Sequence, residues 1–412
     1  MLKRVLLTSV GVLPQYTAKG GQFIPRMALF AIGAATPKDW DLQILADVRE
    51  DQVPLDGDYG VVGMSVLTPH AYASYRVADE LRKRGVKVVM GGPHAASNPK
   101  EALLHADAVV VGEGDGVWPL VLRDLERNES KGRYDSVDFD LNEMPMPRFD
   151  LMDPSRYTMP AIVNLERGCK FKCRWCLVPP VLQGRNVRTK DPHKAADEVR
   201  WLKENFGVSS FAVVDCSVNL NDYMVGFADA VTDLKMKWTG AAVLAALKDT
   251  KALEKIAAAG CDCIYIETGA LAKASNPTRF KSMIETINTA RELGIKCWYN
   301  FELGYEHHDE SIFQDTIEFI ESTRMEQYIF QIFTPWPGGP QFEKIEAEGR
   351  ILTRDWERYN NSYAVHTPKL MTVEQLERGY ARLYEHFYSG SFFECLPLVN
   401  LHTFNHFASF FV

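Results

Sequence analysis

The chain has 412 residues, of which 46% are apolar and 24% are charged, and its formal charge is −8. A chain of this length and composition can bury a sizeable core and predicts two or three domains. The acidic balance, without a long run of Lys or Arg, argues against a nucleic-acid partner. No apolar run reaches the roughly 18 residues of a membrane-spanning helix, so we expect no membrane span.

Residues 1–130 alternate between strand and helix patterns. The apolar segment 5–10 resembles a signal peptide only faintly, because it is short and lacks a small-residue cleavage site, and we interpret it as a buried strand. Near-continuous apolar strands that alternate with helices predict a doubly wound, Rossmann-like parallel sheet. Further strands are expected at 40–45, 59–66, 86–90 and 108–111, and helices at 71–84 and 117–126.

Residues 131–158 carry mixed charge and several prolines, and we interpret them as a linker. From 159 to 340 the alternation resumes with about six strand–helix steps, which are too few for a closed eight-fold barrel but enough for an open one. Residues 341–412 are rich in Tyr and Phe and predict a mostly helical tail. The barrel strands are expected at 162–166, 210–214, 237–242, 263–267, 296–303 and 327–333.

Three of the eight cysteines, Cys169, Cys173 and Cys176, form a C-x3-C-x2-C motif directly after a predicted strand. A disulfide framework would be denser and more evenly spread, so this motif indicates a reducing compartment and a metal. Three thiolates leave one iron of a [4Fe–4S] cluster without a protein ligand. That iron can bind the amino and carboxylate groups of S-adenosylmethionine (SAM) and pass an electron to its sulfonium. The alternatives are a zinc site, which usually has a fourth protein ligand, or three unlinked thiols.

In the order of its motifs the chain resembles the radical SAM superfamily, and within it the methyltransferase-like group (class B) with an N-terminal cobalamin-binding domain. The matching segments are 62–68, 91–95 and 112–116, the cysteine motif, 334–338 and 349–356. The resemblance implies a partial (β/α)6 barrel that holds the [4Fe–4S] cluster and SAM. It also implies a cytoplasmic enzyme with a small-molecule substrate and an external reductant of the flavodoxin or ferredoxin type.

Three glycine-containing loops follow predicted strands of the N-terminal part. Ligands bind outside the carboxyl ends of strands in open α/β sheets, and glycine lets the backbone approach a bulky ligand. The dinucleotide fingerprint G-x-G-x-x-G is absent after the first strand, which argues against NAD. The resemblance implies cobalamin, without a histidine on its lower face; another nucleotide or an unused domain are the alternatives. The residues expected at this site are Ser65, Thr68, Gly91, Gly92, Gly112, Glu113 and Gly114.

Proteins that this chain resembles hold SAM with polar residues at strand ends. Asp215 and Glu267 occupy such ends, and Trp175 lies inside the cysteine motif, so these three residues are expected to contact SAM. Tyr265 stands where relatives commonly have glycine, which is a departure at the Glu267 strand. Capping of the following helix or loop is the alternative role for both carboxylates.

The strand 296–303 carries unusual polar residues for a buried position. Asn300 and Glu302 alternate onto one face with Trp298, and a buried carboxylate requires a partner. We predict that Asn300 and Glu302 face the barrel interior and act on the substrate; a core ion pair with Arg or Lys is the alternative. The polar residues 306–308 in the following loop are expected to be solvated.

These features favour a cobalamin-dependent radical SAM methyltransferase that acts on an unactivated carbon of a small molecule or natural-product intermediate. One SAM would supply a methyl group through cobalamin, and a second would supply the 5′-deoxyadenosyl radical. The first alternative is a radical SAM dehydratase, epimerase or cyclase on a sugar-like substrate, which the pair Asn300 and Glu302 would suit. The second alternative is a cobalamin-binding sensor or carrier with a structural cluster.

Overall fold

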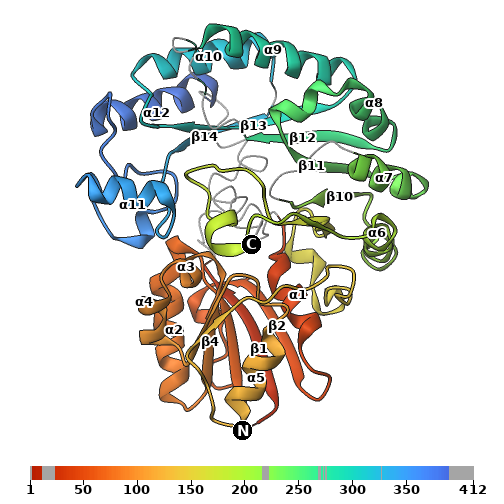
Figure 1. Ribbon diagram of the computed structural model, residues 1–412, viewed down its shortest axis with the longest axis vertical. Coiled ribbons are helices and arrows are strands. Elements are labelled where there is room, and N and C mark those ends of the chain that lie inside the picture. The colour runs from red at the N-terminus through yellow and green to blue at the C-terminus, as the bar shows by residue number, and fades with distance from the viewer. Residues whose placement is uncertain are drawn as a thin grey trace.

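Two parallel β-sheets, one in each half of the chain, define the architecture of the computed structural model (Figure 1). Each sheet has six strands and is covered by helices, and the segment that contains the cysteine motif runs between the two halves (Figure 1). The structure describes residues 2–11, 24–215, 222–267, 271, 273, 276–325 and 327–388. Among these residues no helix is both long enough and apolar enough to cross a bilayer.

The N-terminal sheet has the strand order β2-β1-β3-β4-β5-β6, with every neighbouring pair parallel. Its strands are β1 (Arg4–Val10), β2 (Asp41–Val48), β3 (Val61–Ser65), β4 (Lys87–Gly91), β5 (Ala108–Val111) and β6 (Arg133–Asp135). Strand β6 lies inside the stretch 131–158 that we interpreted as a linker. Only its central residue, Tyr134, is buried, so this short edge strand leaves no periodic pattern in the sequence.

Helices pack on both faces of this sheet, which confirms the doubly wound arrangement. Alternate strand residues face opposite sides: Leu7 belongs to the core on the α1 and α5 side, and Leu6 to the core on the α2 and α4 side. The helices are α1 (Met27–Ala35), α2 (Ala71–Lys83), α3 (Gly92–Ser97), α4 (Pro99–His105) and α5 (Trp118–Glu126). Apolar residues on both faces explain why these strands read as near-continuous apolar runs.

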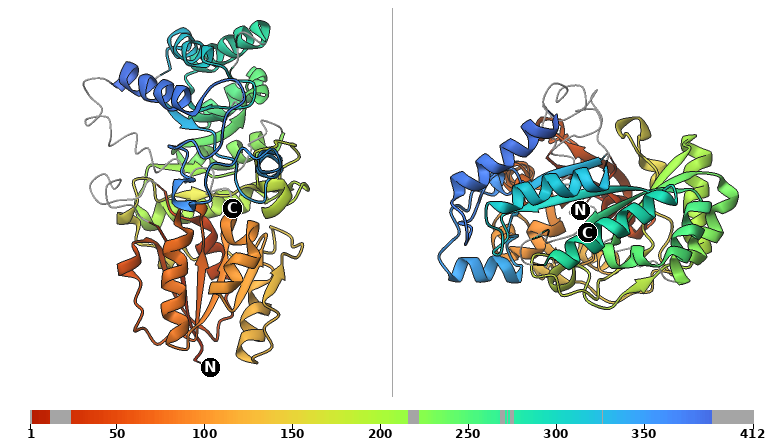
Figure 2. Two further views of the ribbon diagram at one scale, coloured as in Figure 1. Left: turned by 90° about the vertical axis from the view of Figure 1, so that its left-hand side faces the viewer. Right: turned by 90° about the horizontal axis from the view of Figure 1, so that it is seen from above.

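The second sheet confirms the open six-strand barrel, in the order β14-β13-β12-β11-β10-β7. Its strands are β7 (Ile162–Val163), β10 (Ser210–Val213), β11 (Lys237–Val243), β12 (Cys261–Glu267), β13 (Lys296–Leu303) and β14 (Gln327–Ile332). Helices cover its outer side in an arc (Figures 1 and 2). They are α6 (Pro192–Phe206), α7 (Asp222–Val231), α8 (Thr250–Ala258), α9 (Pro277–Glu292) and α10 (Ser311–Thr323).

The first barrel strand is shorter than the predicted strand 162–166. Strand β7 ends at Val163, and β8 (Glu166–Arg167) pairs with β9 (Arg188–Thr189) in a separate antiparallel ribbon. The interruption has a local cause, because the amide of Leu165 donates to the Asp215 carboxylate at 2.9 Å instead of to a strand. The chain therefore leaves the sheet just before the cysteine motif.

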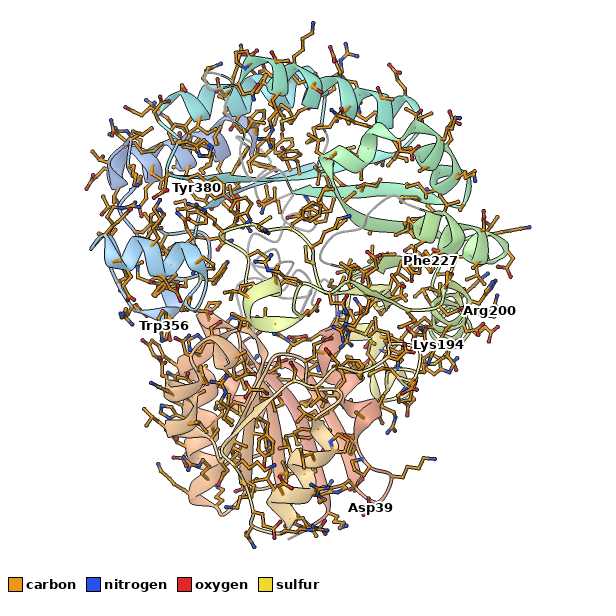
Figure 3. The ribbon with its side chains drawn as sticks, viewed as in Figure 1. Asp39, Lys194, Arg200, Phe227, Trp356 and Tyr380 are labelled. Atoms are coloured by element: carbon orange, nitrogen blue, oxygen red, sulfur yellow. The ribbon has the colours of Figure 1, made fainter. Side chains whose placement is uncertain are left out.

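The C-terminal region contributes two helices, α11 (Pro340–Ala347) and α12 (Val373–Tyr388), joined by an irregular segment. Helix α12 lies against β14, where the Tyr384 hydroxyl donates to the carbonyl oxygen of Phe330 at 2.9 Å. The indole of Trp356 donates to Glu101 of α4 at 2.9 Å, so this region also contacts the N-terminal domain (Figure 3). The part of the predicted tail after residue 388 lies outside the described residues.

Candidate active site

A cavity of about 910 Å³, including its open mouth, lies between the carboxyl ends of the N-terminal strands and the barrel. Six of the seven residues predicted for the cobalamin site line it: Ser65, Gly91, Gly92, Gly112, Glu113 and Gly114. Thr68 is buried at the start of a 3₁₀ turn and is not among the lining residues. The barrel side contributes Asn164, Arg167, Leu182, Gln183 and Val214.

The glycines of this cavity serve two different purposes. Gly92 and Gly112 have φ values of 84° and 89°, a region that favours glycine for backbone reasons alone. Gly91 has a φ of −143°, which any residue can adopt, and an added Cβ would meet only Val110, at 3.8 Å. The absence of a side chain at Gly91 therefore keeps the cavity wall open, as the close approach of a bulky ligand requires.

Four charged side chains join the two walls of the cavity. The Arg167 guanidinium donates through Nη1 to Asp115 at 2.7 Å and to Glu113 at 2.9 Å, and through Nη2 to Asp115 at 3.2 Å. Arg188, the partner of Arg167 in the β8–β9 ribbon, also donates to Glu113. Both guanidinium groups lie over the ring of Phe139, at 5.6 and 5.3 Å from its centre. The loop 112–116 of the first domain is thus tied to the strand that precedes the cysteine motif.

The cysteine motif lies on the loop between β8 and the short π-helix η7 (Val178–Leu182). Cys169 is buried, and Cys173 and Cys176 are partly exposed. Gly168 has a φ of 86°, and a Cβ there would lie 2.1 Å from the carbonyl oxygen of Asn186, so only glycine fits at this bend. An apolar cluster of Cys169, Leu177, Val178 and Leu182 with Ala96 of α3 seats the loop against the N-terminal domain.

The donor set of this loop suits an iron–sulfur cluster. Among the described residues, no three His, Cys, Asp or Glu side chains are grouped so that they could hold one metal ion. A cubane cluster places its thiolates on separate irons, so its three protein ligands are spaced along one loop. Cys169, Cys173 and Cys176 meet that requirement.

Asp215, predicted to contact SAM, is fully buried at the end of β10. Its carboxylate accepts hydrogen bonds from the Leu165 amide at 2.9 Å and from the Asn164 side chain, so it holds the turn that leads to the cysteine motif. Burial raises the pKa of Asp215 to about 7, and burial likewise raises the pKa of Glu166 to about 7. Glu267 ends β12, and its side chain lies outside the described residues.

Trp175 and Glu302 are connected through a residue that sequence reasoning missed. The ring of Trp175 lies 5.4 Å from that of Tyr305, and the Tyr305 hydroxyl donates to the Glu302 carboxylate. Gly304, with a φ of 94°, turns the chain after β13 so that Tyr305 points back toward Glu302. In the sequence, Gly304 lies between the strand-end carboxylate Glu302 and Tyr305, and this glycine was the signal that could have predicted the contact.

Asn300 takes part in a buried group of three amides. The Asn300 side chain donates to Gln331 of β14 at 2.6 Å, and Asn361 of the C-terminal region donates to the same Gln331 oxygen at 3.0 Å. The side-chain oxygens of Asn300 and Asn361 are buried and have no hydrogen-bond partner among the described residues. On the opposite face of β13, Phe301 packs against Phe319 of α10, which confirms the predicted orientation of the strand.

The prediction that residues 306–308 are solvated holds for His307, which is exposed, but is wrong for Glu306 and His308. Glu306 forms ion pairs with Lys344, with Arg350 at 2.8 Å and with Lys369 at 3.0 Å. His308 is only 2% exposed, and burial lowers its pKa to about 3, so its ring is neutral. The loop is covered because the C-terminal region folds over it, and no local pattern in residues 306–308 reports that contact.

Comparison with known families agrees with this geometry. Residues 16–122 match the model of the B12 binding domain, and residues 163–320 match that of the radical SAM superfamily. The chain thus carries a B12 binding domain followed by a radical SAM domain, the combination found in cobalamin-binding radical SAM enzymes. The cofactors expected from the motifs, a [4Fe–4S] cluster, SAM and cobalamin, are those of these two domains.

Individual relatives narrow the comparison. The chain is 28% identical over 365 residues to bacteriochlorophyllide d C-8(2)-methyltransferase of Chlorobaculum tepidum, covering 82% of this chain and 80% of that protein. It is 26% identical over 384 residues to bacteriochlorophyllide d C-12(1)-methyltransferase of the same organism, covering 88% and 82%. The structure of the radical SAM methyltransferase TsrM of Kitasatospora setae, with cobalamin and a [4Fe–4S] cluster bound, gives a TM-score of 0.67 at 13% identity. That match covers 84% of this chain and 75% of TsrM and shows a shared fold.

Proposed function

We propose that this protein transfers a methyl group from SAM to an unactivated carbon of a small molecule. The observation that carries the proposal is the shared cavity, because the glycine loops of the B12 binding domain and the segment leading to the cysteine motif wall the same space. When bound, the cluster and SAM supply a 5′-deoxyadenosyl radical, and cobalamin carries the methyl group. A radical reaction of this kind requires both groups to meet one substrate inside a closed space.

In this proposal the residues of the chain bind, orient and exclude water. Cys169, Cys173 and Cys176 hold the cluster, and the loops around Gly91 and 112–116 cradle the cobalamin, with no histidine on its lower face. Trp175, Asp215 and Glu267 contact SAM. Asn300 and Glu302, with Tyr305 holding the Glu302 carboxylate, position the substrate carbon.

The substrate and the electron donor follow from the same proposal. Both curated relatives named above act on bacteriochlorophyllide d, so a chlorin-type tetrapyrrole is the first small molecule to test. A flavodoxin- or ferredoxin-type protein would supply the electrons. The six described cysteines form no disulfide with one another, which suits the reducing conditions of the cytoplasm, where we place the enzyme.

The test is an isotope experiment with anaerobically purified protein that carries cobalamin and iron. With SAM labelled with ¹³C in its methyl group, we expect the label in the product and 5′-deoxyadenosine in the same reaction mixture. Formation of 5′-deoxyadenosine and of an altered substrate that lacks the label would indicate a dehydratase, epimerase or cyclase reaction instead of methyl transfer. Bound cobalamin without any cleavage of SAM would indicate a sensor or carrier.

A further inference from the structure

The charged network at the seam of the two domains has an unusual position in the sequence. Arg167 precedes Cys169 by two residues, while Glu113 and Asp115 alternate with the cavity-lining glycines of the loop 112–116. Each end of the network is therefore covalently next to a group that would hold a cofactor. We propose that Arg167 is a positioning residue that fixes the cysteine loop relative to the cobalamin-binding loop. This inference deepens the proposed function and rests on it.

The geometry leaves the Arg167 side chain little freedom. Its Nη1 and Nη2 atoms engage Asp115 in a bidentate arrangement, Nη1 also reaches Glu113, and Nε donates to Asn164 at 3.1 Å. A planar guanidinium that is held on three sides fixes both distance and angle, which a lysine ammonium cannot do. Arg167 therefore sets the orientation as well as the separation of the two loops.

Burial and charge make the network hard to break at one point. The side chains of Arg167, Glu113, Asp115 and Arg188 are between 6% and 15% exposed, and two positive charges face two negative charges. Arg167 and Arg188 are neighbours across the β8–β9 ribbon and would repel each other without the two carboxylates between them. Removing one member leaves an uncompensated buried charge, so the loops can separate only together with the loss of several strong contacts.

Positioning of this kind matters because radical and methyl donors act only at short range. A misplacement of about 1 Å far from the chemistry can cost about 100-fold in rate. If Arg167 sets the separation of the two loops, its loss should impair the step that needs both cofactors far more than the cleavage of SAM, which needs only the cluster. If Arg167 formed a purely structural ion pair, its loss would lower the amount of folded protein. It would not change the ratio of product formation to SAM cleavage.

The barrel offers a matched control for this test. Lys190 and Glu198 form another buried ion pair, at 2.8 Å, and Lys190 directly follows β9. This pair joins β9 to α6 within the barrel, and neither of its hydrogen bonds involves the loop 112–116. Glu198→Gln breaks a buried charge pair next to the same ribbon and removes no hydrogen bond of the Arg167 network, although the Glu198 charge also acts on Arg167 through space.

The experiment compares Arg167→Lys and Asp115→Asn with Glu198→Gln. Hydrogen exchange of the chain without cofactors is measured first, on peptides covering residues 112–118 and 168–177. The amide of Trp118 donates to Gly114 at 2.8 Å and that of Cys169 to Gly184 at 3.2 Å, so both peptides contain protected amides. Iron and cobalamin contents, 5′-deoxyadenosine and methylated product are then measured on the holoenzyme.

We expect faster exchange in both peptides for Arg167→Lys and Asp115→Asn but not for Glu198→Gln. Iron and cobalamin should remain bound, and the ratio of 5′-deoxyadenosine to product should rise about 100-fold. An equal effect of Glu198→Gln, unchanged exchange in both loops, or a parallel loss of 5′-deoxyadenosine and product would overturn the proposal. If Arg167→Lys does not fold, Asp115→Asn decides the question from the other domain. The protein could show the expected faster exchange in both peptides and yet transfer no methyl group. That result would support the positioning role of Arg167 and refute the proposed function.

Discussion

The two sheets of this protein are both parallel and six-stranded, yet they use their side chains differently. In the N-terminal sheet both faces are apolar: the neighbours Leu6 and Leu7 are at most 1% exposed and lie in different cores. In the barrel, Phe301 of β13 packs on helix α10, while Asn300 on the other face joins a buried group of amides.

This difference decides where each domain can hold a ligand. A sheet that is apolar on both faces can bind a polar ligand only at the carboxyl ends of its strands, through loops. A sheet that is covered by helices on one face can present functional groups from the strands themselves as well. The N-terminal domain should therefore be sensitive to changes in its loops, and the barrel to changes in both its loop and its strands.

The largest effect is expected at the cysteine loop. Replacement of Cys169, Cys173 and Cys176 together by alanine should abolish iron binding, the brown absorbance and the cleavage of SAM, because no thiolate remains for the cluster. Cys263 on β12 is a partly exposed thiol outside this loop, and Cys263→Ala serves as the control with full iron content. Iron retained in the triple variant would place the cluster elsewhere.

A large effect is also expected on the strand face. Glu302→Gln keeps an acceptor for the Tyr305 hydroxyl, so the free energy of unfolding should change by less than about 1 kcal/mol. Product formation should fall about 100-fold if the carboxylate positions the substrate, while uncoupled 5′-deoxyadenosine production continues. The measurements are thermal unfolding, 5′-deoxyadenosine and product in the same preparation. A large loss of stability with unchanged activity per folded molecule would make Glu302 a scaffold residue.

The glycine loops allow a steric test of the N-terminal domain. Gly91→Val should be tolerated by the backbone, because φ is −143° and only Val110 lies near an added Cβ. The new side chain would occupy the cavity, and overpacking costs about 1–3 kcal/mol, so cobalamin affinity should fall about tenfold or more. Iron content should not change.

The matched control for that variant is Gly226→Val on helix α7, where an added Cβ would meet only Pro192, at 3.8 Å. Cobalamin affinity is measured by titration of both variants. A loss of affinity in the Gly91 variant alone indicates a filled cavity, whereas an equal loss in both indicates a general effect of a bulkier residue. Equal affinity in the Gly91 variant and the parent protein would remove this loop from the cobalamin site.

An effect of pH on stability is expected from the buried carboxyl group at the barrel entrance. Burial raises the pKa of Asp215 from 3.8 to about 7, so the folded chain keeps a proton that the unfolded chain releases. Its contribution to stability is therefore present below pH 4 and is lost as the pH rises to about 7, by up to about 4 kcal/mol. Asp215→Asn should remove the Asp215 part of this decline, while the part due to Glu166, whose pKa burial also raises to about 7, should remain. Denaturant unfolding of the cofactor-free chain at several pH values measures both.

His308 should act in the opposite direction and with a similar magnitude. Burial lowers its pKa from 6.5 to about 3, so its contribution to stability is complete above pH 6.5 and is lost as the pH falls toward 3. His308→Gln should flatten the acid side of the stability profile and leave the neutral side unchanged. A parallel shift of the whole profile would show that the substitution acts through packing instead of titration.

Most of the architecture could be predicted from local patterns in the sequence. The strand and helix periods gave both sheets, and the errors are short pieces: β6 has one buried residue, and the strand 162–166 breaks where Asp215 captures an amide. Six of the seven residues predicted for the cobalamin site line one cavity, because glycines at strand ends mark the edge where parallel strands bind ligands. Thr68 is the exception, since it is buried in a turn beside that edge.

The sequence by itself determined the cysteine motif, the glycine loops and the order of strands and helices, because each of these depends on residues close together in the chain. The tertiary structure decided which side chains meet across the cavity. Arg167 lies more than 50 positions from Glu113 and Asp115, Glu306 pairs with residues of the C-terminal region, and Tyr305 meets Trp175 of the cysteine loop. Periodicity reports which face of an element is buried, but not which element covers it. That choice depends on how the two sheets and the C-terminal region pack, so the contacts that would align the two cofactors appear only in the folded chain.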